Sequence, residues 1–175
     1  DPGPPLGKKR NIALEAARGE IIAWFDDDDW QHPMRLAWLV PELRESAETH
    51  GTSFLGPSRS WFLSIDGRHS EPYDVGRYAI FNGAVFYTEM ARRARFPEDV
   101  LRTEDTLWVS ALLRLCRGGA WAGEQPLVFF WLTHQTNTTN RRGARAMSGE
   151  PSSVRRAAGK YWGDTTEQLR ALRAR

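Results

Sequence analysis

Four consecutive aspartates, Asp26 to Asp29, are the residues of this sequence that most clearly indicate chemistry. Neighbouring carboxylates repel one another and raise one another's pKa, so holding four together is unfavourable unless a cation is bound. A hard divalent ion such as Mg²⁺ takes one or two protein carboxylates and completes its shell with water and substrate phosphates. The run therefore predicts a metal or phosphate site, and the alternative is that these acids only cap the helix expected after them.

Three other groups of polar residues are candidates for the same chemistry. Glu104 and Asp105 open an expected helix, where a carboxylate in a pocket can accept a proton from a hydroxyl, although acids are also common at helix starts. His134 lies in a polar stretch after an apolar run. Its imidazole is interpreted either as a ligand or as an ordinary polar side chain of a loop. The basic cluster Lys8–Arg10 faces either a phosphate or solvent.

The expected elements place the aspartates at the end of a buried strand. Lys9–Arg18 is predicted to be a helix with Gly19 as its C-cap, and Glu20–Phe25 reads as a strand buried on both faces of a parallel sheet. Pro33 suits the first turn of the next helix. Ligands of open α/β sheets bind beyond the carboxyl ends of strands, so this position supports a binding site. The apolar face of the first helix is predicted to be Ile12, Ala13, Ala16 and Ala17.

Further strands and helices are expected as far as about residue 140. Thr52–Leu55 and Ser60–Ile65 are predicted to pair as strands, and Val128–Leu132 is predicted to be a buried strand. A helix is expected over Glu104–Leu115, ended by Gly118-Gly119. The apolar stripe of that helix is predicted to be Leu107, Ala111 and Leu115.

Length and composition indicate one globular domain with a basic tail. The chain has 175 residues, of which 41% are hydrophobic, and residues 141–175 carry nine basic and three acidic side chains. Its longest apolar runs are well short of the roughly 20 residues that span a bilayer. The single cysteine, Cys116, argues against an internal disulfide and a structural zinc site, and no signal-peptide pattern follows Asp1. We expect a cytoplasmic protein, peripheral to a membrane if the tail binds one.

The order of these motifs resembles that of family 2 glycosyltransferases, which have the GT-A fold, over residues 7 to about 140. Its most specific parts are Arg10-Asn11, the string from Gly19 to Trp30 and the separate Glu104-Asp105 pair. The other matching positions are Pro33, Asn82-Gly83, Phe96-Pro97-Glu98 and His134 with Asn137-Thr138-Thr139. The resemblance implies an α/β fold, a partial GT-A-like mixed sheet flanked by helices, in a single domain over residues 1–140. Residues 141–175 are then a basic, helical tail.

The resemblance also implies an activity, namely the transfer of a sugar from a nucleotide-diphosphate sugar of the UDP or GDP type to an acceptor hydroxyl. Transfer would be inverting, metal-dependent and of the hexosyltransferase type. Asp26 is expected near the ribose, and Asp28 on a Mn²⁺ or Mg²⁺ ion that bridges the diphosphate. His134 matches a position that reaches the diphosphate or its metal.

The remaining site residues are likewise assigned by the resemblance. Asp105 falls on the position of the catalytic base, with Glu104 beside it orienting the acceptor or the donor sugar. Arg10 and Asn11 match the segment that lies against the donor nucleotide, and Gly83 is expected on the same donor side.

The family begins with strands that hold the nucleobase, and the chain is expected to start after them. Apolar surface on Ile21–Phe25 would then be exposed and would favour a homo-oligomer. One alternative function is a non-catalytic, truncated homologue that binds a divalent metal or a nucleotide sugar. Another is a phosphoryl- or nucleotidyl-transfer enzyme, which needs a second metal.

The basic tail has two interpretations. Residues 141–175 either contact an anionic membrane surface or form a solvated segment. No nucleic-acid partner is expected, because Tyr161 and Trp162 are the only aromatic residues among these charges.

Overall fold

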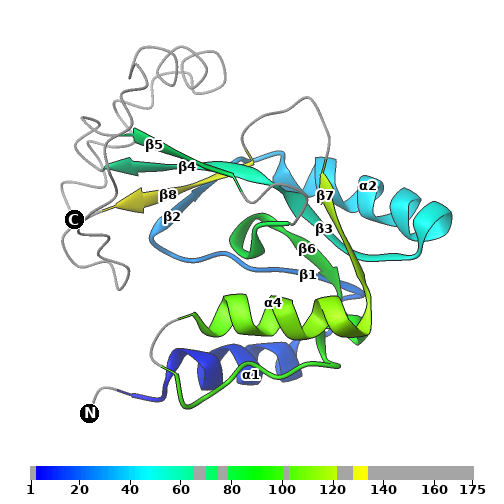
Figure 1. Ribbon diagram of the computed structural model, residues 1–175, viewed down its shortest axis with the longest axis horizontal. Coiled ribbons are helices and arrows are strands. Elements are labelled where there is room, and N and C mark those ends of the chain that lie inside the picture. The colour runs from blue at the N-terminus through cyan, green and yellow to red at the C-terminus, as the bar shows by residue number, and fades with distance from the viewer. Residues whose placement is uncertain (1–2, 65–69, 75–78, 101–102, 122–127, 134–175) are drawn as a thin grey trace.

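Two mixed sheets and the helices around them form the structure, a computed structural model that describes residues 3–64, 70–74, 79–100, 103–121 and 128–133 (Figure 1). The first sheet has the order β1 (Ile21–Ala23), β6 (Val85–Tyr87), β3 (Thr52–Pro57), β7 (Arg117–Trp121). The second has the order β2 (Asp29–Gln31), β8 (Phe129–Thr133), β4 (Arg59–Ser64), β5 (Ser70–Asp74). The helices are α1 (Leu6–Ala16), α2 (Arg35–His50), α3 (Thr88–Ala91), α4 (Glu104–Leu115) and the 3₁₀ turn η1 (Phe81–Gly83). The expected α/β class with a mixed sheet is confirmed.

The first sheet lies between two helical layers, because its side chains alternate between its faces. Phe54 and Phe86 pack toward α1 and α4, whereas their neighbours Leu55 and Val85 pack toward α2. Their helical partners are Leu14, Trp108 and Leu112 on the first side, and Leu39 and Leu43 on the second. Figure 1 shows α1 and α4 side by side on one face and α2 on the other.

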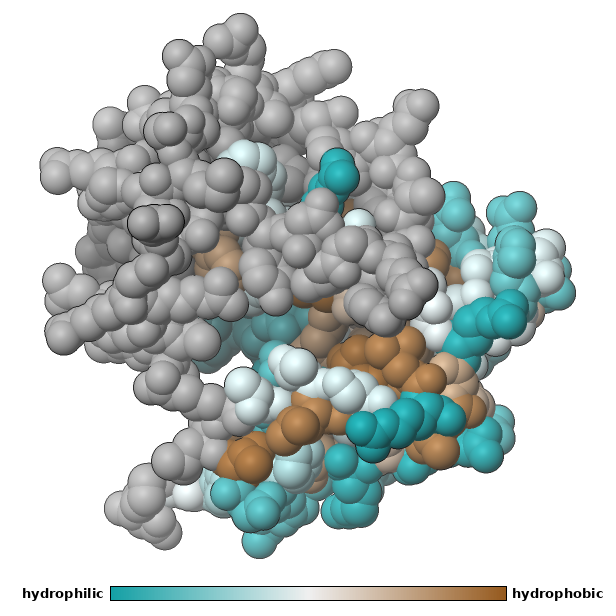
Figure 2. Space-filling model, viewed as in Figure 1, coloured by the Kyte–Doolittle hydropathy of each residue, from teal (hydrophilic) through white to brown (hydrophobic). Residues whose placement is uncertain are grey.

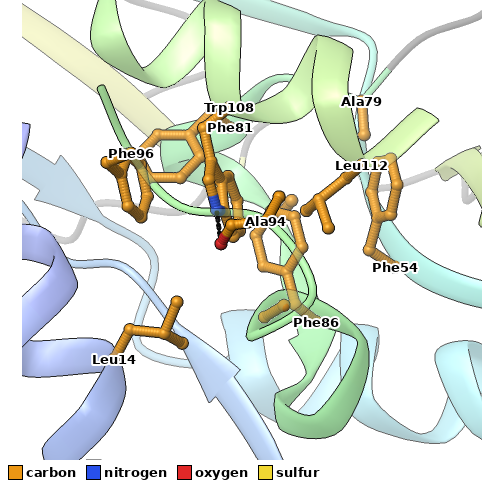
Figure 3. Close-up of a cluster of buried hydrophobic side chains, with 11 residues drawn as sticks. Leu14, Phe54, Ala79, Phe81, Phe86, Ala94, Phe96, Trp108 and Leu112 are labelled. Carbon is orange, nitrogen blue, oxygen red and sulfur yellow. Dashed lines mark hydrogen bonds between the residues drawn. The ribbon is translucent and has the colours of Figure 1, made fainter. Parts of the chain in front are cut away.

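A cluster of aromatic rings holds the start of α4 against the rest of the domain (Figure 3). The fully buried Trp108 stacks on Phe96 with ring centroids 4.4 Å apart and meets Phe81 edge-on at 5.5 Å. Its indole N–H donates to the Ala94 carbonyl over 3.0 Å, so the polar end of the ring is satisfied where it is buried. The cluster fixes α4 relative to η1 and to the connector around residue 96.

The predicted inward face of α1 is wrong. Ile12 is 54% exposed, and Ala13 and Ala16 also face solvent. The side of the helix that is buried consists of Gly7, Arg10, Asn11 and Leu14. Polar side chains face inward here because Arg10 and Asn11 find buried hydrogen-bond partners on distant segments.

The predicted end of this helix also differs from the structure. α1 ends at Ala16 rather than at Arg18, and Gly19 is not its cap. The guanidinium of Arg92, at the end of α3, donates to the carbonyls of Leu14, Glu15 and Ala17. A side chain more than 70 residues away therefore satisfies the carbonyls that the helix end leaves open.

The apolar run before the aspartates forms an edge strand, not a strand inside a parallel sheet. β1 pairs only with β6 among the described strands, and this pairing is antiparallel; the parallel pairs are β3 with β7 and β4 with β8. Residues 21–24 are half-buried because the two helical layers cover both faces of the strand. Of the predicted exposed stretch Ile21–Phe25, Phe25 is the residue that is more than half exposed.

Helix α4 has the predicted bounds, but its buried face lies one residue further along. Trp108 and Leu112 are buried, while Leu107 and Leu115 are each 48% exposed. Gly118-Gly119 lies inside β7, where a Cβ at Gly118 would overlap the ring of Phe54. The rotation follows from the partners of the helix, because Glu104 must reach Arg10 while Trp108 enters the aromatic cluster.

The strands predicted at Thr52–Leu55 and Ser60–Ile65 are present as β3 and β4, but their predicted pairing is wrong. They lie in different sheets, and β4 pairs with β5 instead. The predicted strand Val128–Leu132 corresponds to β8. The basic segment 141–175 lies outside the described residues, so the tail and its boundary remain predictions. No helix within the described ranges combines the length and the apolar character that crossing a bilayer requires.

The inward face of α1 leads to a test by substitution. A Cβ at Gly7 would overlap the backbone carbonyl oxygen of Pro97, so Gly7→Ala should destabilise the fold by about 1–3 kcal/mol although alanine favours helices. Ile12→Ala, on the exposed face, should change stability by less than about 0.5 kcal/mol. Urea unfolding followed by circular dichroism measures both variants. A larger loss for Ile12→Ala would show that the helix is rotated.

Candidate active site

The aspartate run crosses from one sheet to the other. It leaves β1 at the end of the first sheet, and its last member, Asp29, opens β2 of the second sheet opposite Trp131 of β8. We call residues 26–29 the acidic loop. Asp27 and Asp28 are exposed at its tip, whereas Asp26 and Asp29 are half-buried. The loop thus lies at the junction of the two sheets (Figure 1).

A buried arginine joins the acidic loop to the start of α4. Arg10 is 7% exposed, and its Nη1 lies 2.6 Å from Glu104 Oε1 while its Nη2 lies 3.6 Å from Asp26 Oδ1. Its guanidinium also lies over the rings of Phe81, at 4.8 Å, and Phe96, at 5.7 Å. Arginine suits such a position because its planar, weakly hydrated cation can pair with carboxylates and stack on aromatic rings together. The two acidic groups found in the sequence are therefore brought to one side of the molecule.

Asn82 holds the acidic loop from the opposite side. Its Nδ2 donates to Asp26 Oδ2 and, over 3.3 Å, to Asp29 Oδ2. The next residue, Gly83, is required for packing, because a Cβ there would overlap Pro57 and the ring of Phe129. The Asn82-Gly83 pair thus allows η1 to approach closely enough for its amide to bind two loop carboxylates.

The electrostatics of the loop favour a cation. Burial raises the pKa of Asp26 above its usual value, while the Arg10 guanidinium acts in the opposite direction. The charge of Asp105 raises this pKa further, so the loop and the start of α4 interact through space. Burial also raises the pKa of Asp29 to about 7, with the charges of Asp26 and Asp28 adding to the effect. A cation bound nearby would lower both pKa values and favour the ionised carboxylates.

Arg35 is a residue of the site that the sequence interpretation missed. Its side chain is 1% exposed and donates to the Trp24 carbonyl over 3.0 Å, to the Ala84 carbonyl over 2.9 Å and to Gln31 Oε1. Trp24 precedes the acidic loop and Gln31 follows it, so one guanidinium binds both flanks of the loop and ties them to the first sheet. Its guanidinium also lies over the ring of Phe25, at 4.6 Å.

Arg35 is cationic in spite of its burial. Burial lowers its pKa to about 10, and the charge of Asp26 opposes that shift. A signal for its role was present in the sequence, because a cation at the first position of a helix is opposed by the helix dipole. An arginine placed there calls for a separate explanation, and the acidic loop provides one.

Asn11 lies apart from the acidic loop and fixes a neighbouring connector. Its Nδ2 donates to the Phe96 carbonyl over 2.9 Å, and its Oδ1 accepts from the Phe96 N–H over 2.9 Å. Nδ2 also donates to Glu98 Oε1 over 2.8 Å. The contacts to the donor expected for Asn11 and Gly83 stay predictions, and His134 lies outside the described residues.

Asp105 opens onto a cavity of about 570 Å³ that Asn82 also lines. Its Oδ1 accepts from the Thr106 N–H over 2.6 Å at the start of α4, and its side chain is half-buried. The adjacent Glu104 is buried and engaged by Arg10. Of the two acids, Asp105 is therefore the one placed to meet a bound molecule. Figure 2 shows apolar and weakly polar side chains along the visible surface of α4.

A divalent ion is compatible with the loop if a second molecule supplies further ligands. Within the described ranges, no three acidic, histidine or cysteine side chains gather into a ready-made metal cage. The exposed Asp28, supported by Asp26 or Asp29, nevertheless offers the one or two carboxylates that Mg²⁺ or Mn²⁺ takes when a diphosphate completes its shell. The pKa values of Asp26 and Asp29 are raised, so a cation bound at the acidic loop would favour the ionised form of both carboxyl groups.

Comparison with known proteins places this arrangement in context. The family described as glycosyl transferase family 2 matches residues 5–98, just over half of the chain. The fold is similar to the crystal structure of S. aureus TarS 1-349, with a TM-score of 0.52 and 19% sequence identity, over 73% of this chain and 40% of that one. The chain thus spans less than half the length of that structure. The likeness confirms the GT-A-like fold, and no curated protein matches the sequence.

The raised pKa of Asp29 predicts an effect on stability that depends on pH. Its pKa is about 7 in the folded protein and about 4 in an unfolded chain, so ionisation weakens the fold as pH rises from about 4 to 7. Asp29→Asn keeps an acceptor for Asn82 and should stabilise the metal-free protein by about 1–3 kcal/mol at pH 8, and much less at pH 4. Thermal unfolding in a chelating buffer measures this. The control is Asp27→Asn, in the exposed loop tip, and a gain that is equal at both pH values would contradict the prediction.

Proposed function

This chain belongs to glycosyl transferase family 2, and from that premise we propose that its site moves a sugar from a nucleotide-diphosphate sugar to an acceptor hydroxyl. We propose a donor of the UDP or GDP type, a hexosyl group and inversion at the anomeric carbon. The observation that carries the proposal is the Arg10 bridge, which holds the acidic loop beside the Glu104-Asp105 helix start. Asp105 lines the cavity there, together with Asn82, the hydrogen-bond partner of two loop carboxylates. Sugar transfer with inversion needs these two kinds of group on either side of one carbon atom.

The acidic loop would serve the leaving group. When the bond between the anomeric carbon and the diphosphate breaks, negative charge develops on the departing oxygen. A Mn²⁺ or Mg²⁺ ion held by Asp28 would neutralise that charge. Asp26 lies deeper and is held by Arg10 and Asn82, so its part is to present the loop and, as the resemblance implies, to lie near the ribose.

Asp105 would serve the acceptor. The acceptor oxygen forms its bond to the anomeric carbon while its proton passes to a carboxylate on the face opposite the diphosphate. Asp105 lines the cavity, whereas Glu104 is engaged by Arg10. We therefore assign the base to Asp105, and we assign Glu104 the task of holding Arg10 and, through it, Asp26.

The same contact disfavours two-metal phosphoryl transfer. A second metal would need the Glu104-Asp105 pair as its ligands, because the acidic loop already holds the first. Arg10 lies 2.6 Å from the Glu104 carboxylate and so engages a group that a second cation would need as a ligand. A cytoplasmic location, membrane contact through residues 141–175 and a homo-oligomer remain proposals from the sequence.

Asp28 provides the test of metal-dependent donor binding. Asp28→Ala should weaken the affinity for UDP or GDP in the presence of Mn²⁺ by at least about tenfold, because it would remove a carboxylate ligand from the ion that accompanies the diphosphate. The matched control is Asp27→Ala, its exposed neighbour in the same loop, which should bind like the unchanged protein. Isothermal titration calorimetry with and without Mn²⁺ measures the affinities. Equal losses in the two variants would remove Asp28 from the site.

Asp105 provides the test of catalysis. Asp105→Asn should bind UDP or GDP with Mn²⁺ normally but lower transfer by about 10²-fold or more, because the amide cannot take the acceptor proton. Release of nucleoside diphosphate from a mixture of UDP- and GDP-sugars measures turnover. Glu89→Gln, an exposed acid at the start of α3, is the control.

The same assay separates an enzyme from a binding protein. Full turnover in Asp105→Asn would refute the assignment of the base. An unchanged protein that binds a nucleotide with Mn²⁺ but releases no diphosphate from any donor would instead be the non-catalytic homologue.

A further inference from the structure

Helix α4 has a third face, which borders a cavity. One face is buried through Glu104, Trp108 and Leu112, and Leu107 and Leu115 are exposed on another. Six other side chains of the helix line the cavity that begins at Asp105; they are Asp105, Thr106, Val109, Ser110, Leu113 and Arg114. The cavity therefore extends along most of the helix, well beyond the carboxylate assigned as base.

The wall facing α4 is apolar and firmly held. It includes Ile80, Phe81 and Trp131, with Asn82 beside the acidic loop. Trp131 stacks on Phe62 with ring centroids 4.5 Å apart and an interplanar angle of 15°, so its ring is fixed in orientation. Such a wall suits the C–H face of a sugar ring or another flat, apolar surface.

The volume and lining of this cavity are those of a site for a small molecule. At about 570 Å³ it lies within the range usual for ligand pockets, which combine apolar walls with a few polar groups. It also exceeds what a single hydroxyl beside Asp105 needs. The cavity lining therefore indicates which groups the acceptor carries besides the reacting hydroxyl.

Charge distinguishes the two ends of the cavity. Asp105 lies at one end and Arg114 follows it by nine residues, which places the two about 13 Å apart along the helix axis. Arg114 is the only cationic residue among the described residues that line the cavity. A guanidinium is well matched to phosphate oxygens, which it binds with paired hydrogen bonds.

We infer that this cavity is the acceptor site and that it takes a glycan acceptor carrying a phosphate group about 10–15 Å from the reacting hydroxyl. The inference rests on the proposed function, because it uses Asp105 as the base. In this arrangement the hydroxyl meets Asp105, a sugar ring lies against Trp131, and the phosphate meets Arg114.

Two probes that differ only in the phosphate test the inference. Lactose and lactose 1-phosphate are titrated by calorimetry into the full chain saturated with Mn²⁺ and the nucleotide, UDP or GDP, that it binds, with inorganic phosphate as a third probe. Lactose 1-phosphate should bind about tenfold more tightly than lactose, and inorganic phosphate alone should not reproduce its affinity. Equal affinities for the two sugars, or binding of neither, would overturn the inference.

Variants locate the interaction. Arg114→Gln should abolish the preference for lactose 1-phosphate and leave lactose binding unchanged, while Arg18→Gln, an exposed arginine outside the cavity lining, should keep the preference. Ser110→Phe should block both sugars by filling the cavity while keeping nucleotide binding, which also shows that the variant is folded. Sugar binding that survives Ser110→Phe would place the acceptor elsewhere. If the unchanged protein does not bind a nucleotide with Mn²⁺, the proposed function is refuted. Failure of the proposed function is thereby distinguished from failure of the inferred acceptor site.

Discussion

The buried guanidinium of Arg10 is the interaction on which the arrangement of the site depends. It carries a full positive charge among aromatic rings, where water cannot solvate it, so it must be compensated by carboxylates. Glu104 at 2.6 Å and Asp26 at 3.6 Å provide that compensation from segments that are far apart in the chain. Because none of these charges is stable alone in this environment, α1, the acidic loop and the start of α4 are held in one relative position.

The acidic loop is held in place by the buried arginines Arg10 and Arg35 and by Asn82. Arg35 donates hydrogen bonds to the Trp24 carbonyl before the loop and to the side chain of Gln31 after it. Asn82 donates to two carboxylates of the loop. Both arginines are buried on the protein side of the loop, while Asp28 faces outward. A loop that is supported from inside the protein and exposes a carboxylate to solvent suits the binding of a divalent ion together with a diphosphate.

Helix α4 connects the stability of the domain to its chemistry. Its Trp108 packs in the aromatic cluster and donates a hydrogen bond to Ala94, so packing determines the direction of the helix and the position of its first turn. Asp105 and Arg114 then follow as fixed points on the face that lines the cavity. The same packing therefore positions the carboxylate and the guanidinium on that face, and the spacing between them underlies the length of acceptor that we infer.

Local pattern was enough for the sequence to determine the bounds of α4, the strands β3, β4 and β8, and the position of the aspartates after a strand. It also determined the family, because the order of short motifs survives where overall similarity is low. Only the tertiary structure decided the other features. These are the inward faces of α1 and α4, the edge position of β1, the separation of β3 from β4 and the part played by Arg35. The physical reason is that each depends on a partner far along the chain: Glu104 lies 94 residues from Arg10, Phe96 lies 85 from Asn11, and Ala84 lies 49 from Arg35. Apolar periodicity assumes that buried faces are apolar, and it fails where a buried polar side chain finds such a partner.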